Sequence, residues 1–160
     1  MKFNLPITAL ALSLVTGAKA QSSHGYGFVG AGGATANGYT SRMVSFGFGG
    51  EARIVPHIGA GVELSGLGLT SNYWDSIAGM FSPNGYVHFK GSRDAKFDPY
   101  VSGGYTLIFR SGHANLANFG GGANFWPKRH LGFKVDVRDH VTTRYYTIHY
   151  WEVRAGVTFR

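Results

Sequence analysis

The clearest pattern in the chain is an unbroken alternation of apolar and polar residues from Ile148 to Arg160. The apolar positions are Trp151, Val153, Ala155, Val157 and Phe159, and the polar ones are Tyr150, Glu152, Arg154, Gly156 and Thr158. A period of two over this length predicts a β-strand with one apolar and one polar face. The polar face includes full charges, so the environment of that face has to accommodate ions.

Seven earlier stretches show a similar, less regular alternation, and turn-forming or polar segments separate them. The eight predicted strands are 25–33, 42–53, 58–65, 79–90, 99–110, 118–126, 131–138 and 148–160. Eight antiparallel strands of about ten residues, tilted by roughly 40°, span an apolar band of about 25 Å. The sequence therefore predicts an all-β fold, an eight-stranded antiparallel up-and-down transmembrane β-barrel. An even number of strands places both ends of the barrel sequence on one side.

Composition supports strands over helices. The chain of 160 residues is 44% hydrophobic and only 14% charged, below the charged fraction of about 25% in soluble domains. Its mean hydropathy is nevertheless −0.06, and after residue 20 no apolar run approaches the roughly 20 residues of a membrane helix. The 25 glycines and 15% aromatic residues suit closely packed strands. There is no cysteine, so a disulfide framework and a thiolate metal site are excluded.

The first twenty residues have the pattern of a signal peptide. Lys2 provides the positive start, residues 5–15 form an apolar core, and Ala18-Lys19-Ala20 is a small-x-small cleavage site. We expect cleavage after Ala20, which divides the chain into a signal peptide (1–20) and a barrel domain (21–160).

The chain has a surplus of positive charge. Loss of Lys2 and Lys19 with the signal peptide would lower the formal charge from +7 to +5. This surplus favours contact with anionic surfaces such as phosphorylated lipid head groups. Nucleic acid is not an expected partner, because the basic residues are dispersed singly and form no run.

If the polar faces point inward, the lumen contains five positive and four negative side chains. These are Glu51, Arg53, Glu63, Arg110, Lys134, Asp136, Arg138, Glu152 and Arg154. A final hairpin centred on Tyr145 places Arg138 opposite Glu152 and Asp136 opposite Arg154, two complementary pairs. A shift of two residues would oppose Asp136 and Glu152, so the charges favour one register.

The interior of an eight-stranded barrel is just wide enough for its own side chains to fill. We therefore expect a plugged lumen with paired charges. The alternative is a narrow porin-like channel, in which the pairs switch and admit ions.

The whole predicted mature chain resembles the small OmpA/OmpX-type outer-membrane β-barrels. The resemblance rests on the signal peptide, Asp98-Pro99-Tyr100-Val101 opening a glycine-rich strand, Gly120-Gly121-Gly122, the charged strand Leu131–Arg138 and the last strand with Phe159. It implies a location in the outer membrane of a Gram-negative-type bacterium, in contact with membrane lipid and lipopolysaccharide, most simply as a monomer. It also implies handling by periplasmic chaperones and by the barrel-assembly machinery, with Phe159 as the assembly signal although Arg160 follows it.

Aromatic side chains near the strand ends suggest two membrane-interface girdles. The outer group comprises Trp74, Tyr145, Tyr146 and Trp151, and the inner group comprises Tyr100, Trp126, Phe133 and Phe159.

The sequence gives less support for a catalytic or a metal-binding site than for a barrel with a structural role. Ser111 and His113 share a short loop with no carboxylate nearby in sequence, and they do not match the His-x-Ser pattern of the lipid A deacylase barrels. His113, His140 and His149 could meet at one rim beside Asp139, but no spacing compels it. We therefore expect no enzyme activity, no cofactor and no metal.

The leading interpretation is a structural or surface-interaction outer-membrane barrel. A soluble periplasmic barrel of lipocalin type is the rival, in which the apolar faces would line a cavity and the charges would face water. Period two alone does not say which face is outside.

Overall fold

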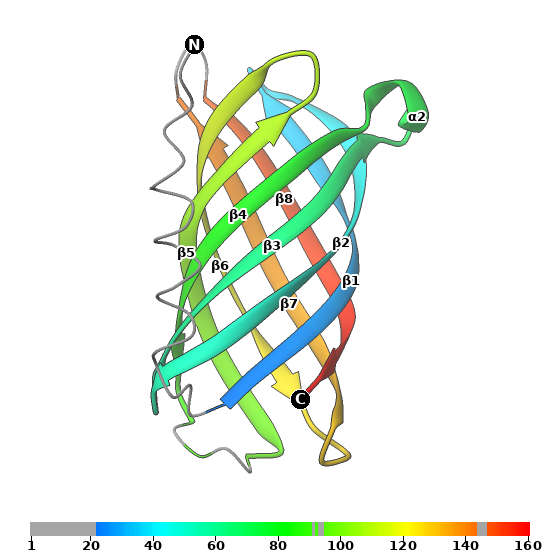
Figure 1. Cartoon of the computed structure of the whole chain (residues 1–160). Coiled ribbons are helices and arrows are strands. Elements are labelled where there is room, and N and C mark those ends of the chain that lie inside the picture. The colour runs from blue at the N-terminus through cyan, green and yellow to red at the C-terminus, as the bar shows by residue number, and fades with distance from the viewer. Residues whose placement is uncertain (1–21, 91, 93–94, 144–146) are drawn as a thin grey trace, which may run out of the picture.

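The computed structural model describes residues 22–90, 92, 95–143 and 147–160, and shows a closed antiparallel barrel of eight strands (Figure 1). Each strand pairs with its neighbour in sequence, and β8 pairs with β1. The strands are β1 (Ser22–Ala36), β2 (Tyr39–Val55), β3 (Ile58–Leu69), β4 (Ala78–His88), β5 (Phe97–Phe109), β6 (His113–Phe125), β7 (Leu131–Thr142) and β8 (Ile148–Phe159). The predicted all-β barrel fold is confirmed. The predicted signal peptide, 1–20, lies outside the described residues.

The alternating residues separate cleanly between the two faces of the wall. Phe48 and Val153 are 63% and 52% exposed, whereas Glu152 and Arg154 are each 3% exposed. The large apolar side chains therefore cover the outside, and the charges lie inside. This arrangement rules out the lipocalin-type alternative, which requires the opposite faces.

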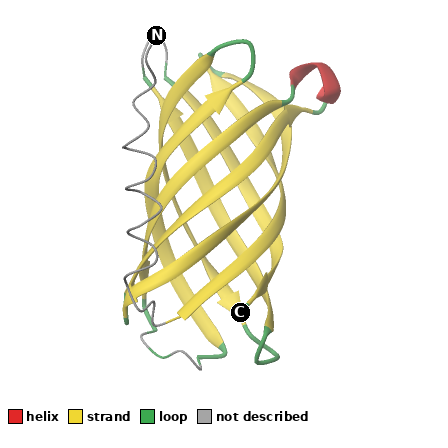
Figure 2. Cartoon of the chain, viewed as in Figure 1, coloured by secondary structure: helices red, strands yellow, loops and turns green. Residues whose placement is uncertain are grey.

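The two ends of the barrel differ in their connections (Figure 2). The end where β1 starts and β8 finishes, here called the terminal end, has the connections 56–57, 89–96 and 126–130. The opposite end, the loop end, has the connections 37–38, 70–77, 110–112 and 143–147. The one described helix, α2 (Tyr73–Ser76), lies at the loop end, and no helix in the described ranges is long and apolar enough to cross a membrane.

The first connection is much shorter than the loop predicted from Ala34 to Ser41, and that prediction was wrong. β1 and β2 remain paired up to Ala36 and Tyr39. Asn37 and Gly38 form the turn, with positive φ angles of 50° and 81°. Asn-Gly is the preferred pair for a two-residue turn with positive φ at both positions, because its twist matches that of the strands.

Several outward aromatic rings lie over a glycine directly opposite on the next strand. Gly25 pairs with Phe159 across the β1–β8 seam, and a Cβ built on Gly25 would come within 2.7 Å of that ring. Gly79 pairs with Phe109 in the same way. The glycines thus leave room for the rings against the outer wall, where the rings cover backbone that would otherwise be exposed.

A substitution at Gly38 tests the hairpin. Gly38→Ala should lower the free energy of unfolding of the refolded barrel by about 1 kcal/mol, because alanine resists positive φ. Urea unfolding in lipid vesicles measures it. Gly112→Ala is the matched control, since a Cβ at Gly38 or Gly112 would meet no atom within 4 Å but only Gly38 has positive φ. Equal losses in both variants would contradict the turn geometry.

Candidate functional site: the filled lumen

Eight of the nine predicted lumenal charges are buried inside the barrel. Arg110 is the exception, and its assignment to the lumen was wrong. β5 ends at Phe109, and Arg110 is exposed in the following turn, where its backbone N–H donates to the Gly112 carbonyl. The predicted strand extended one residue beyond the C-terminal end of β5. That extra residue fell at a position of the alternation that would face inward.

The final hairpin has the predicted register, with Asp136 opposite Arg154 and Arg138 opposite Glu152. Arg154 donates to Asp136 through both Nε, at 2.6 Å, and Nη2, at 2.9 Å. Arg138 instead donates to Asn118 Oδ1 on the neighbouring strand β6 at 3.1 Å, and its Nη2 lies 3.6 Å from Glu63 Oε1 on β3, across the lumen. Asp136 and Arg154 therefore form a bidentate ion pair, whereas Arg138 and Glu152 lie opposite each other without a direct ion pair.

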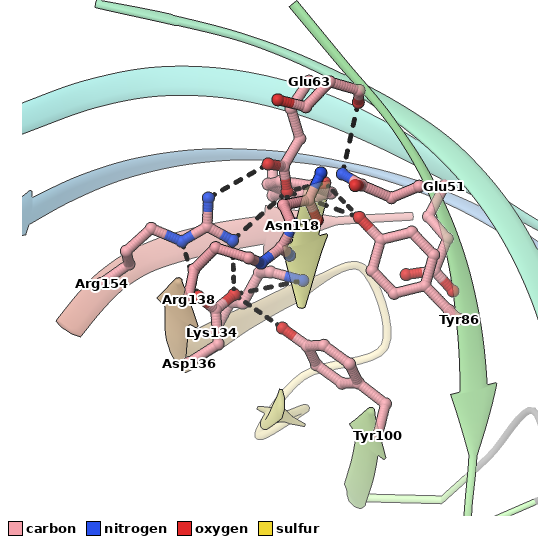
Figure 3. Close-up of polar contacts among 12 residues, drawn as sticks. Glu51, Glu63, Tyr86, Tyr100, Asn118, Lys134, Asp136, Arg138 and Arg154 are labelled. Atoms are coloured by element: carbon pink, nitrogen blue, oxygen red, sulfur yellow. Dashed lines mark hydrogen bonds and ion pairs between the residues drawn. The ribbon is translucent and has the colours of Figure 1, made fainter. Parts of the chain in front are cut away.

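Glu63 is the central acceptor of the lumen (Figure 3). Arg154 donates to its two carboxylate oxygens at 3.0 and 3.3 Å, and Arg138 Nη2 lies 3.6 Å from Oε1. The Tyr26 and Tyr86 hydroxyls donate to Oε1 at 2.7 and 3.4 Å. These partners come from β1, β4, β7 and β8, so side chains from opposite walls meet at one carboxylate.

Lys134 occupies a cage of tyrosine rings beside this cluster. Its Nζ is 4.3 Å from the ring centroids of Tyr26 and Tyr100, and 5.5 Å from that of Tyr86. Asp136 Oδ2 lies 3.8 Å away and accepts a hydrogen bond from the Tyr100 hydroxyl at 2.7 Å. An ammonium group over desolvated aromatic faces is attracted by their quadrupoles, worth up to about 2 kcal/mol for each good contact.

A second ionic group lies nearer the terminal end. His88 Nε2 is 2.5 Å from Glu51 Oε1, and His88 Nδ1 is 3.0 Å from Asp98 Oδ2. Arg53 donates to Asp98 and to the Lys90 carbonyl. The group links β2, β4 and β5 across the lumen.

A third group lies toward the loop end. Ser45 donates to Glu152, and His140 Nε2 is 3.9 Å from the other oxygen of the same carboxylate. His140 Nδ1 is 2.9 Å from the Thr106 hydroxyl, which is 2.8 Å from that of Ser82. Small hydroxyl groups thus occupy the lumen on the loop-end side of the large ions.

Apolar side chains close the lumen at the loop end. Met43, Leu67 and Met80 form a buried cluster, here called the apolar septum, and Ile108 and Tyr150 pack against it. The septum explains why Ile108 interrupts the polar face of β5, since this part of the lumen is apolar.

At the terminal end, the Trp126 and His24 rings meet edge to face. Trp126 is buried, with its ring 5.7 Å from that of His24, and the Arg160 guanidinium lies 4.3 Å above the Trp126 ring. Arg160 Nε also donates to the Arg129 carbonyl at 3.0 Å. Trp126 and Tyr100 were predicted in the inner girdle, and this was wrong because both side chains turn into the lumen.

Other predicted girdle residues fit better or cannot be placed. Phe133, Trp151 and Phe159 are exposed on the outer wall. Tyr145 and Tyr146 lie outside the described residues, as does the side chain of Trp74.

The three histidines considered as metal ligands point in different directions. His113 is exposed at the start of β6, His140 faces the lumen, and His149 Nδ1 is 2.7 Å from Asp139 Oδ2. Within the described part of the chain, no group of three or more His, Cys, Asp or Glu side chains could hold a metal ion.

Comparison with known proteins identifies the architecture through structure alone. No protein-family model and no curated protein sequence matches the chain. Neisserial surface protein A matches with a TM-score of 0.64 at 10% identity, covering 86% of this chain and 96% of that one. The N-terminal β-barrel domain of Pseudomonas aeruginosa OprF gives 0.61 at 15% identity, covering 87% and 97%. The outer membrane protein OprG of the same organism gives 0.57 at 11% identity, covering 86% and 93%.

The fold is that of the small eight-stranded outer-membrane β-barrels. The predicted resemblance to the OmpA/OmpX-type class is thus confirmed at the level of fold.

Several lumenal residues of this barrel were not predicted, although their parity pointed inward. Tyr86 and His88 share a face with Asn84, and Tyr100 shares one with Ser102. Asp98 was placed in a turn because β5 begins two residues earlier than predicted. The inward face of β1, which the glycine-rich sequence left open, contains Tyr26 and Phe28.

Two double-mutant cycles on one hairpin test the contacts. Asp136→Ala and Arg154→Ala should each cost about 3 to 5 kcal/mol of unfolding free energy, because each leaves a buried charge without a partner. The double variant should recover about 1 to 3 kcal/mol relative to additivity. Arg138→Ala with Glu152→Ala is the comparison cycle, because these opposed charges form no direct ion pair and are linked through Arg154 and Glu63, and its coupling should be smaller than that of the first cycle. Equal coupling in both cycles, measured by urea unfolding, would contradict the arrangement.

Proposed function

We propose that the chain is an integral outer-membrane barrel with a filled, charge-paired and non-conducting lumen, serving a structural or surface-interaction role. The observation that carries the proposal is the meeting of Arg154, Arg138, Tyr26 and Tyr86 at Glu63, since these side chains come from four strands around the barrel. Side chains that meet from opposite walls occupy the cross-section that an ion would need.

The outer wall supports a membrane location. Its exposed residues include Val29, Phe46, Phe48, Val62, Phe119, Val135, Val137, Val153 and Val157. A continuous apolar exterior over a charged interior is the arrangement of a lipid-embedded barrel and would be unfavourable in water. The structural neighbours named above, one of them described as a surface protein and another as an outer membrane protein, favour the same location.

The apolar septum supports a non-conducting lumen independently of the charges. An ion that passed the septum would lose its hydration without gaining a polar ligand from Met43, Leu67 or Met80. The channel alternative would need both the septum and the Glu63 cluster to open together.

Several further parts of the proposal rest on the resemblance. We expect outer-membrane phospholipid and lipopolysaccharide around the wall, chaperones and the assembly machinery during biogenesis, and a monomer in the membrane. Phe159, the proposed assembly signal, is exposed on β8 between Gly25 and Leu131 of its neighbouring strands. We propose no catalytic role, because Ser111 is exposed in a three-residue connection and His113 pairs with Phe109 across it.

Planar-bilayer recording tests the filled lumen. The refolded protein should insert without producing steady current steps, because the septum and the Glu63 cluster both obstruct the lumen. Heat-modifiable gel mobility of the same preparation, together with its dependence on detergent, verifies that the barrel is folded and membrane-inserted.

Steady steps in every insertion would favour the channel alternative, provided that they pass through the lumen. Two variants on β4 make that distinction. Tyr86→Ala, which removes an inward ring, would enlarge a lumenal current, whereas Phe81→Ala, on the outward face, would leave it unchanged. A monomer that is soluble without detergent would overturn the membrane proposal as a whole.

A further inference from the structure

The terminal end of the barrel has four exposed basic side chains in its connections. These residues, here called the basic rim, are Lys90, Lys96, Lys128 and Arg129. The connections of this end lie at the lower end of the barrel in Figure 1, where the C-terminus is marked.

The described residues at this end contain no exposed Asp or Glu side chain. Asp98, near the start of β5, is buried and bonded to Arg53 and His88. Among the described residues, the exposed charge at this end is therefore positive.

Each rim residue lies close in sequence to an outward apolar side chain at a strand end. Lys90 follows Phe89, and Lys96 precedes Phe97. The two remaining residues, Lys128 and Arg129, lie between Phe125 and Leu131. These four apolar side chains are between 42% and 63% exposed. The rim charges thus lie directly beyond the outward apolar side chains, at the level where a bilayer changes from hydrocarbon to head groups.

The loop end has a different charge pattern. Its exposed basic side chains in the described ranges are Arg42 and Arg110, and it also has the acidic residues Asp75 and Asp139. Asp139 is paired with His149. Among the described residues, the exposed basic side chains therefore outnumber the acidic ones by more at the terminal end than at the loop end.

We infer that the basic rim binds the phosphate groups of anionic phospholipids in the leaflet at the terminal end. The inference rests on the proposed membrane location and adds a lipid class and a side to it. Its basis is charge complementarity at the depth of the head groups, where a basic side chain gains from an anionic surface and its alkyl stem remains in contact with apolar side chains.

The test compares lipid selectivity at the protein boundary. Spin-labelled phosphatidylglycerol and phosphatidylcholine, added to bilayers containing the reconstituted protein, give the relative association constant of the two lipids. Lys128→Gln with Arg129→Gln should lower the selectivity for phosphatidylglycerol by about fivefold for each charge that contacts a head group. Lys90→Gln with Lys96→Gln should act similarly, and 1 M salt should abolish the selectivity of the unmodified protein.

Arg42→Gln with Arg110→Gln is the matched control, because it removes the same charge from the loop end. This control should retain the selectivity of the unmodified protein. An equal loss in the control and the rim variants, or no loss in either, overturns the inference while the barrel remains inserted and heat-modifiable. Failure of the unmodified protein to insert overturns the proposed function and the inference together.

A soluble acidic partner would behave differently. Poly-glutamate that binds the protein in pure phosphatidylcholine bilayers, loses that binding in the rim variants and coincides with no lipid selectivity would also overturn the inference. Phosphatidylglycerol selectivity that is lost only in the rim variants supports it.

Discussion

Arg154 joins two carboxylates from two other strands, and the rest of the lumen is arranged around that contact. Its guanidinium reaches Asp136 on β7 and Glu63 on β3. Buried ions are tolerated only when partners and hydrogen bonds replace water. The requirement extends from Glu63 to two tyrosine hydroxyls and Arg138, and from Asp136 to Tyr100 and Lys134. One ion pair thus fixes the positions of side chains from most of the barrel wall.

The lumen changes character along its axis. Edge-to-face rings and an ionic group around His88 lie at the terminal end, large ions occupy the middle, and hydroxyl groups lead to the apolar septum. Among the described lumenal residues, four Lys or Arg side chains face five Asp or Glu side chains, with His88 between two of the carboxylates. Because the charges inside the barrel nearly balance, the excess of positive charge lies outside the lumen.

Sequence reasoning succeeded where period two is strong. In β7 and β8 every outward and inward residue from Leu131 to Arg138 and from Trp151 to Phe159 was predicted, including the register. It failed at strand ends, where a small error in the boundary decides whether a residue is assigned to the lumen. Arg110 was predicted in the lumen but is exposed, and Asp98 was predicted in a turn but is buried in the lumen. It also could not show that Arg138 would choose Glu63 over Glu152, because that choice depends on side chains crossing the lumen from β3, which no local pattern records.

The long-range origin of the ion pairs has a consequence for how the barrel forms. Glu63 and Arg154 are separated by 91 residues in sequence, so their contact forms only when the last strand docks against the first. In the proposed membrane location, an open sheet entering lipid would expose the lumenal charges at a cost that the hydrocarbon cannot offset. Under that proposal, insertion and closure would be coupled into one cooperative step. The charged interior would make a half-inserted intermediate costly and leave the closed barrel as the favourable state.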